Sequence, residues 1–349
     1  MRKLKIFGRN VIELTGAIHI HTSHSFDSET PIEKIIKTAR KYRIDYLMIT
    51  DHNNLECRNE KSVKESDYPK VIVGTEVNDK QLNNHLLVFE SDKIYTNCDA
   101  REYTQKYHEE KAISFVAHPS EKRACGKYRK YEWTLNDFSQ VDGLEIWNFL
   151  SSWLGKLRPS LNGIFMVLFP FLFTGKPEKE NLEIWDRVNV NGQRKAGIGS
   201  IDAHGTPVSF GKFTFHILKH KLLLRSLRTN ILLEENTEIS NRSILRALKN
   251  GNSYIVNYRR GMPYNFYAGI SGLNGKEAIF GEEINFAPGL KFYFRLPGIC
   301  RIDLYRNGKK SDFVKDEKGF FEIKEKGSYR LEILRYGRGW IYTNNIYVI

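Results

Sequence analysis

Cysteine is scarce in this sequence of 349 residues, and no apolar run is long enough to cross a membrane. The cysteines lie too far apart to form a CxxC pair, so the sequence signals neither a sulfur-ligated zinc site nor a disulfide framework. A GxSxG motif is also missing, which removes the usual sign of a serine nucleophile. We expect free thiols at the four positions Cys57, Cys98, Cys125 and Cys300.

The N-terminal segment lacks the features of a secretory signal. Its basic residues are followed by neither a long apolar run nor a cleavage site of small residues. Together with the expected free thiols, this favours a protein of the reducing cytoplasm.

The most apolar stretch is residues 163–173, GIFMVLFPFLF. It is too short to span a bilayer and contains Pro170, so we expect no transmembrane segment. The composition favours a buried or lid-like segment over docking on a membrane surface. Trp153 and Lys156 beside it keep the membrane-surface alternative open.

Positive charge is in excess. Lys and Arg number 54 against 41 Asp and Glu, a net charge of +13 that favours anionic partners such as a small phosphorylated substrate. Residues 205–265 hold ten Lys and Arg, Lys212 among them, against three Glu, a net of +7. A solvated basic face explains this segment most simply, because no nucleic-acid-binding motif accompanies it. A nucleic acid partner remains an open alternative, not a requirement.

Short apolar runs alternate with amphipathic stretches through the first 200 residues, which indicates strands alternating with helices. Thr30 is placed to cap the first helix, with Pro31 at its first position and Glu33 completing a capping box. We expect seven strands, at residues 17–20, 46–50, 71–76, 85–89, 112–117, 143–147 and 196–201.

After about residue 262 the pattern changes to alternating apolar and polar residues between turn signals such as Asn307-Gly308. This is typical of a small antiparallel β-sandwich. We therefore predict an α/β domain over residues 1–260, with an insertion or lid at 149–190, and a β-sandwich domain over 261–349.

Residues able to bind metals gather at the predicted strand ends. Two pairs, His19 with His21 and Asp202 with His204, are spaced so that on an extended backbone both side chains point to one side. Because the strand ends of a βα barrel share one face, these side chains should converge there. The other candidates at strand ends or in adjoining loops are Asp27, Asp51, His52, Glu76, His85 and His118.

Converging histidines and carboxylates form the ligand set of Zn²⁺, Mn²⁺ or Fe²⁺. A single histidine is more often held by an ordinary hydrogen bond, but this set is too regular for that interpretation. The remaining histidines lack such placement, and we expect ordinary structural roles for His24, His108, His216 and His220.

The motifs HIHT, ITDH, GTE, AHP and SIDAHG, in this order, resemble those of the PHP (polymerase and histidinol phosphatase) superfamily. The resemblance covers residues 16 to about 260 and implies a distorted seven-stranded βα barrel with a trinuclear metal site. GLEIWN, the segment WDRVNVNGQRKAGIGSIDAHG and the C-terminal sandwich resemble the CehA/McbA-like metallohydrolase branch.

Carried over position by position, the resemblance implies two or three divalent ions (Zn, Mn or Fe) per chain. Glu76 would bridge the first two ions. The first set is His19, His21, Glu76 and Asp202; the second is Glu76, His85 and His118; the third is Asp27, His52 and His204.

Clustered divalent ions activate water and clamp phosphoryl oxygens, so we predict a phosphoesterase acting on a small phosphomonoester or a nucleotide end. Asp51 is expected to orient a ligand imidazole or accept a proton. Lys122 and Arg123 are expected to contact the phosphate, with solvated loop charges as an equally weighted alternative.

The sequence leaves three rival functions open. The same fold could hydrolyse a non-phosphate ester or a carbamate, or it could act as a nuclease. The third rival is a binding module with structural metals, which the Cys-poor ligand set disfavours. The sequence leaves the substrate, the identity of the metal and the oligomeric state open.

Overall fold

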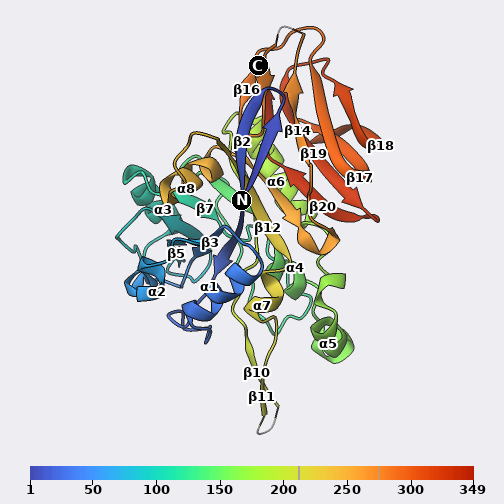
Figure 1. The fold of residues 1–349 in the computed structure, drawn as a ribbon. Coiled ribbons are helices and arrows are strands. Elements are labelled where there is room, and N and C mark those ends of the chain that lie inside the picture. Colours follow the sequence, from blue (N-terminus) through green and yellow to red (C-terminus); the bar gives the residue numbers. More distant parts are fainter. Residues whose placement is uncertain (211–212, 274) are drawn as a thin grey trace.

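A computed structural model describes residues 1–210, 213–273 and 275–349. Lys212, counted above in the basic segment, lies outside the described residues. The helices lie mainly in the left and lower parts of Figure 1, and the upper right part consists of strands. The helices are α1 (Ile32–Lys41), α2 (Lys61–Lys64), α3 (Ala100–Glu109), α4 (Phe149–Leu154), α5 (Pro159–Leu168), α6 (Lys179–Val190), α7 (His220–Leu223) and α8 (Asn241–Lys249), with 3-10 turns η1 (Glu56–Asn59), η2 (Pro170–Leu172) and η3 (Tyr258–Arg260).

A large sheet of 14 strands runs through the whole molecule, in the order β15-β14-β17-β19-β20-β13-β12-β2-β3-β4 along its main path. The pairs β2–β3 and β3–β4 are parallel, and the other neighbours on this path are antiparallel. Its strands are β1 (Arg2–Ile6), β2 (Arg9–Ile20), β3 (Tyr46–Ile49), β4 (Lys70–Val73), β12 (Leu227–Glu234), β13 (Ser253–Asn257), β14 (Tyr267–Ser271), β15 (Glu277–Ala278), β16 (Glu283–Ile284), β17 (Lys291–Arg306), β18 (Lys309–Glu322), β19 (Gly327–Arg335), β20 (Arg338–Thr343) and β21 (Ile346–Val348).

A second sheet of five strands has the order β5-β6-β7-β8-β9. β6 is antiparallel to both of its neighbours, whereas β7, β8 and β9 are parallel. A separate hairpin, β10 (Pro207–Phe210) with β11 (Phe213–His216), projects from the bottom of the molecule (Figure 1). The strands of the second sheet are β5 (Thr75–Val77), β6 (Leu86–Phe89), β7 (Ile113–Val116), β8 (Gly143–Asn148) and β9 (Ala196–Ser200).

All seven strands expected in the first 200 residues are present, and the third is divided at Gly74 into β4 and β5. A Cβ atom at Gly74 would lie 2.2 Å from the carbonyl oxygen of Val88, so only glycine fits this close approach of two strands. The mixed α/β fold is confirmed. A seven-stranded barrel is not confirmed, because the strands divide between two sheets joined by isolated bridges at Ile20–Ala203 and His52–Glu76.

Helix α1 buries the apolar face that its sequence predicts, formed by Ile32, Ile35, Ile36 and Ala39. The predicted capping box is wrong. The helix begins at Ile32 after Pro31, and within the described ranges no side chain caps it. Glu33 instead accepts a hydrogen bond from the Ser62 hydroxyl at 3.1 Å, which draws its carboxylate toward α2 and away from the helix start.

The C-terminal strands are antiparallel over most of their pairs, as expected, and lie at the upper right of Figure 1. Their apolar side chains, which include Phe292, Ile302, Leu331 and Trp340, pack in one core with Val11 of β2 and other residues of β1, β12 and β13. Strand β20 pairs directly with β13, so the C-terminal strands continue the large sheet. The division into two domains at residue 260 therefore stays a prediction.

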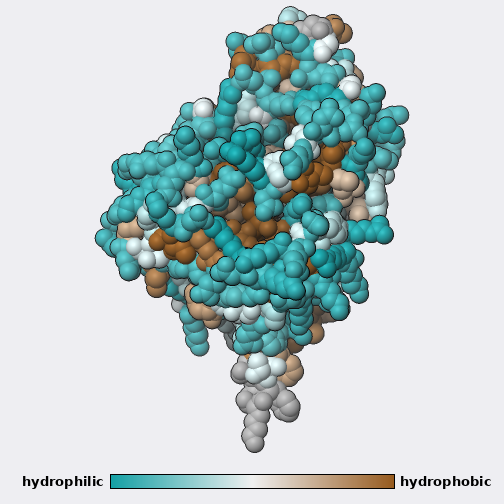
Figure 2. All heavy atoms as spheres, turned by 60° about the vertical axis from the view of Figure 1, so that its left-hand side comes forward, coloured by the Kyte–Doolittle hydropathy of each residue, from teal (hydrophilic) through white to brown (hydrophobic). Residues whose placement is uncertain are grey.

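Most of the apolar stretch 163–173 is not buried, and the lid-like alternative stays a prediction. Of its side chains, Met166 and Pro170 are buried, whereas Ile164 and Leu168 are 81% and 66% exposed. α5 stands apart from the sheets at the lower right of Figure 1. The face seen in Figure 2 is mostly hydrophilic, with hydrophobic residues confined to a few patches. Of the helices in the described ranges, none has the length and apolarity needed to cross a bilayer.

A buried ion pair connects the C-terminal strands to the α/β part. Arg330 on β19 donates to both carboxylate oxygens of Asp186 on α6, at 2.8 and 2.7 Å, and to Glu332 at 2.6 Å. The arginine is almost completely buried, so its loss leaves two acidic side chains without a partner.

Replacing Arg330 with Ala should therefore lower the free energy of unfolding by about 3–5 kcal/mol, as measured by urea denaturation. Arg306→Ala is the matched control, because Arg306 on β17 forms a partly exposed pair with Glu325. That control should cost at most about 1 kcal/mol. Equal effects of the two substitutions would contradict the structural role of Arg330.

Candidate metal centre

The nine predicted ligands come together at the ends of strands from both sheets. Seven of them line a cavity of about 420 Å³, and His19 and His21 lie completely buried at its base. The bridges Ile20–Ala203 and His52–Glu76 hold the strand ends in contact at this point. The seven side chains lining the cavity are Asp27, His52, Glu76, His85, His118, Asp202 and His204.

Glu76 on β5 lies at the centre of the group. Its Oε2 atom is 3.1 Å from Nε2 of His19 and 3.3 Å from Nε2 of His21. Its Oε1 atom is 2.7 Å from Nδ1 of His85 and 3.3 Å from Nε2 of His118. Each carboxylate oxygen therefore faces a different set of histidines, the arrangement expected of a bridging ligand.

Asp202 faces the same histidine pair from the end of β9. Its Oδ1 atom lies 3.4 Å from Nε2 of His19 and 3.6 Å from Nε2 of His21. It is also 3.4 Å from Nδ1 of His204. Asp202 thus extends the cluster from Glu76 toward the loop that follows β9.

Asp27 gathers the remaining ligands near the mouth of the cavity. Its Oδ2 atom is 3.2 Å from Nε2 of His52 and 3.1 Å from Nε2 of His204. His52 also reaches Glu76, with Nδ1 3.4 Å from Oε2. The groups of ligands in the structure therefore overlap more than the predicted sets do. His52 lies near both Asp27 and Glu76, and His21 lies close to Asp27, His52 and His204.

The donor set fits divalent cations. Two ligands held about 2.1 Å from a tetrahedral ion lie about 3.4 Å apart, and the ligand atoms described above lie 2.7 to 3.6 Å apart. Imidazole nitrogen with carboxylate oxygen suits Zn²⁺, Mn²⁺ or Fe²⁺. Three groups of these side chains could hold an ion; the assignment of individual ligands stays a prediction.

Three of these ligand residues have backbone conformations that L-amino acids rarely adopt. The φ angles are +65° at His19, +29° at His118 and +51° at Asp202. His19 also lies where the register between β2 and β3 shifts. The expectation of an extended backbone is therefore wrong at both His19 and Asp202, although His19 and His21 still face Glu76. Such strain costs of order 1–3 kcal/mol per residue and clusters at functional sites.

Buried charges in the cluster shift one another's pKa values. Burial opposes protonation of His21, but the carboxylates of Asp202 and Glu76 outweigh it and raise the pKa to about 9. His118 is also buried, and Glu121 and Glu76 raise its pKa to about 9. Burial disfavours ionised Glu76, yet the neighbouring histidines hold its pKa well below the ordinary value. Without a cation, protons on the histidines balance the buried carboxylates.

Glu145 on β8 is a site residue that the sequence analysis missed. One of its oxygens lies 2.7 Å from Nδ1 of His19, which directs Nε2 of that ring at Glu76. The other oxygen accepts the backbone N–H of His118 at 2.8 Å. Asn148 donates to both Glu145 and Asp202, at 2.7 and 3.2 Å. The available signal was an acidic residue inside the otherwise apolar strand GLEIW.

Asp51 does not have the predicted contact. Its two carboxylate oxygens accept hydrogen bonds from the backbone N–H and the hydroxyl of Thr22, at 2.6 and 2.7 Å. Among the described residues no imidazole reaches it, so it orients the loop after His21 rather than a ligand ring.

The two basic candidates, neighbours in sequence, separate in space. Lys122 is half exposed, pairs with Glu180 on α6 at 2.6 Å and does not line the cavity, so its placement lends no support to the expected phosphate contact. Arg123 lines the cavity, with its guanidinium buried and 2.7 Å from Glu121. Arg123 alone stays a candidate for binding an anionic substrate.

Apolar and aromatic side chains form the rest of the cavity wall. Phe26 stacks on His52 with ring centroids 5.0 Å apart, and Tyr131 lies 4.8 Å from the ring of His85. Leu150 and Leu154, both on α4, complete this side. The cavity thus combines an ion-binding base with a wall suited to an apolar or aromatic group.

The histidines expected to have ordinary roles are found outside the ligand cluster. His24 and His216 pair with Glu60 and Glu29 on the surface. His108 is an exposed residue of α3. His220 is buried, with Nε2 2.8 Å from the carbonyl oxygen of His21, so it supports the base of the site from behind.

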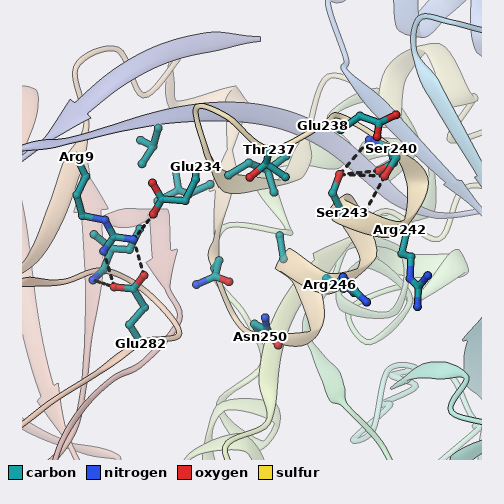
Figure 3. Close-up of a pocket in the computed structure, with 16 residues that line it drawn as sticks. Arg9, Glu234, Thr237, Glu238, Ser240, Arg242, Ser243, Arg246, Asn250 and Glu282 are labelled. Atoms are coloured by element: carbon teal, nitrogen blue, oxygen red, sulfur yellow. Dashed lines mark hydrogen bonds and ion pairs between the residues drawn. The ribbon is translucent and has the colours of Figure 1, made fainter.

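A second cavity lies away from these ligands, between the start of β2, the end of β12 and helix α8 (Figure 3). Arg9 on its wall is paired with Glu282 and Glu234. Since none of the predicted metal ligands lines it, we assign the chemistry to the histidine-rich cavity.

The order and spacing of the ligands agree with a known domain. Residues 17–123 match the PHP domain. This segment contains His19, His21, Asp27, His52, Glu76, His85 and His118, seven of the nine predicted ligands. Asp202 and His204 lie beyond it and are joined to it in space by the Ile20–Ala203 bridge.

The chain also resembles solved structures at low sequence identity. One is a two-domain protein from Bacteroides vulgatus ATCC 8482 containing a predicted PHP-like metal-dependent phosphoesterase: 14% identical, covering 96% of this chain and 95% of that one, with a TM-score of 0.45. Another is PsfC from Pseudomonas syringae PB-5123: 11% identical, covering 70% and 91%, with a TM-score of 0.42. No curated protein is similar enough in sequence to be a relative.

The pKa shifts predict how the metal-stripped protein responds to pH. His21 and His118 have pKa values of about 9 in the folded protein, against an ordinary value of 6.5. Their stabilisation is complete below pH 6.5 and is lost as the pH rises through 9. The Tm of metal-stripped protein should therefore fall across this window in thermal denaturation.

Metal-loaded protein is the comparison, because bound cations need deprotonated imidazoles and so favour the higher pH. Its Tm should exceed that of the stripped protein by a margin that grows with pH. If the Tm of metal-stripped protein rises between pH 6.5 and pH 9, His21 and His118 are not the protonated, stabilising groups described above.

Glu145 provides a test of the support behind His19. Glu145→Gln should weaken metal binding by about 10- to 100-fold, because a carboxylate behind a ligand imidazole fixes its orientation and raises its basicity. Competition with a chromogenic chelator measures the affinity. The control is Glu132→Gln, which removes a half-exposed carboxylate paired with Lys130. Unchanged affinity in Glu145→Gln would remove the supporting role.

Proposed function

We propose that this protein is a metal-dependent hydrolase of phosphoesters, acting on a small phosphomonoester or a nucleotide end. The observation that carries the proposal is the Glu76 carboxylate, which faces His19 and His21 with one oxygen and His85 and His118 with the other. The PHP domain match over residues 17–123 supports an enzyme that hydrolyses phosphoesters.

The ligand groups would hold two or three divalent ions, from among zinc, manganese and iron. Bound ions of this kind lower the pKa of a coordinated water and neutralise charge on phosphoryl oxygens. Glu145 and Asn148 would keep His19 and Asp202 oriented throughout, through the hydrogen bonds described above. No nucleophilic side chain is needed, because solvent supplies the attacking oxygen.

Arg123 would hold the substrate's phosphoryl group. Its buried guanidinium is oriented by Glu121, which itself accepts hydrogen bonds from the Tyr131 backbone and the Ser151 hydroxyl. A guanidinium held in this way can present its remaining N–H groups to phosphate oxygens. Phe26 and Tyr131 would contact the organic part of the substrate.

The proposal also includes the barrel and the C-terminal domain that the sequence predicts. The two bridges support reading β2 to β9 as a distorted seven-stranded ring, with residues 261–349 as a β-rich second domain. The apolar wall of Phe26, Leu150 and Leu154 also suits an uncharged aromatic ester or carbamate, the substrate class that the CehA/McbA-like branch suggests. A panel of aryl phosphates against the corresponding unphosphorylated aryl esters separates the two substrate classes.

The function predicts turnover of p-nitrophenyl phosphate by protein loaded with manganese or zinc. Glu76→Gln should abolish turnover, because two of the three ligand groups share this carboxylate. Arg123→Ala should lower kcat/KM by about 10²-fold, the usual effect of removing a donor to developing charge.

Lys122→Ala is the matched control for Arg123→Ala, since Lys122 lies next to it in sequence but faces Glu180. It should retain turnover. Full turnover by chelator-stripped protein, or equal losses in the Lys122 and Arg123 variants, would count against the proposal.

A further inference from the structure

The segment of α5 and η2, residues 159–173, presents apolar side chains to solvent. Leu161, Ile164 and Leu168 are 78%, 81% and 66% exposed, and Phe165 and Phe169 are about half exposed. A helix on the surface of a globular protein normally turns such residues toward the core. An exposed apolar cluster of this kind marks an interaction site.

This segment, called the α5 segment below, is held in place by the rest of the protein. The indole N–H of Trp153 donates to the carbonyl oxygen of Met166 at 3.2 Å, and Met166 is buried. The ring of Phe171 packs against Phe149 with centroids 5.8 Å apart. Lys156 donates to the carbonyl oxygen of Phe173 at 2.6 Å. The exposed residues are therefore presented on an anchored base.

Only basic residues accompany the α5 segment in the sequence. Residues 149–177 contain no Asp or Glu, and their charged residues are Lys156, Arg158 and Lys176. All three are exposed, and Lys156 is also 3.6 Å from Glu178, so Arg158 and Lys176 carry the positive charge of this range that no acidic side chain in the described residues pairs with. An apolar surface rimmed by positive charge is the composition that binds anionic bilayers.

Arginines from distant parts of the chain add to this charge. The Arg259 guanidinium lies 4.2 Å from the ring centroid of Phe171, and Arg338 donates to the carbonyl oxygen of Leu172 at 2.7 Å. Arg260 is close enough to Arg338 and Arg259 for their charges to lower its pKa, after the larger effect of burial. Across the described ranges, none of these three arginines forms an ion pair with an acidic side chain.

We propose that the α5 segment docks onto the surface of an anionic lipid bilayer. The exposed Leu, Ile and Phe side chains would enter the acyl boundary, while the lysines and arginines meet the headgroups. A nucleic acid would use the arginines but leave the aliphatic side chains in water. A second copy of the chain, related by a two-fold axis, would bring the two arginine groups together, which like charges oppose.

Vesicle flotation tests the proposal directly, with the full chain and two lipid compositions. Binding to phosphatidylglycerol–phosphatidylcholine vesicles should exceed binding to pure phosphatidylcholine at least about tenfold, since each basic residue near an anionic surface adds about fivefold. The double variant Ile164→Glu, Leu168→Glu should lose at least about tenfold of the binding to the mixed vesicles.

Ile299→Glu is the matched control, because Ile299 is 66% exposed on β17, away from the α5 segment. It should bind vesicles like the unmodified protein. The thermal transition of the double variant should match that of the unmodified protein, which separates lost docking from lost folding. The measurement needs no turnover, so it is independent of the proposed function.

Four results would overturn the proposal. The first is equal binding to neutral and anionic vesicles, or none to either. The second is vesicle binding that the double variant retains. The third is a dimer of the unmodified protein, detected by light scattering, that the double substitution dissociates, when neither the unmodified protein nor the double variant binds vesicles. That result would assign the surface to a second copy of the chain. Tight binding of a single-stranded oligonucleotide without vesicle binding would assign the positive charge to nucleic acid instead.

Discussion

Both oxygens of the Glu76 carboxylate are engaged by histidines that come from different strands, and this shared carboxylate organises the site. Burying a carboxylate is costly unless it is paired. Here the compensation comes from side chains at the ends of β2, β6 and β7, which no local sequence constraint brings together. The sheets must therefore form correctly before the charge of Glu76 is satisfied, which ties the chemistry of the site to the fold as a whole.

The ligands were predictable because strand-end positions leave a clear pattern in the sequence. His19 with His21 and Asp202 with His204 each lie in or just after an apolar run. In the structure His19 and His21 lie near Glu76, His204 lies near Asp27, and Asp202 lies near His19. Their role as ligands remains a prediction. What the pattern could not reveal is backbone conformation: His19 faces Glu76 from a positive φ angle, not from the extended strand that the spacing suggested.

The supporting residues were harder to predict, because their roles depend on side-chain direction. Lys122 and Arg123 are adjacent in sequence, yet one reaches Glu180 at the surface and the other lines the cavity. Glu145 is an acidic residue inside an apolar strand, a signal that the sequence contains, but its role is defined by its contact with His19. Strand pairing is equally non-local. β2 pairs with β12 along its first part and with β3 along its second, so one strand belongs to both the antiparallel and the parallel parts of the large sheet.

Helix α4 has a further consequence through its position. Leu150 and Leu154 form part of the cavity wall, and Trp153 on the same short helix is hydrogen-bonded to Met166 of α5. The six residues of α4 thus lie between the exposed apolar surface of α5 and the histidine-rich cavity. The wall of the cavity and the anchor of α5 therefore depend on the same short helix, Phe149–Leu154.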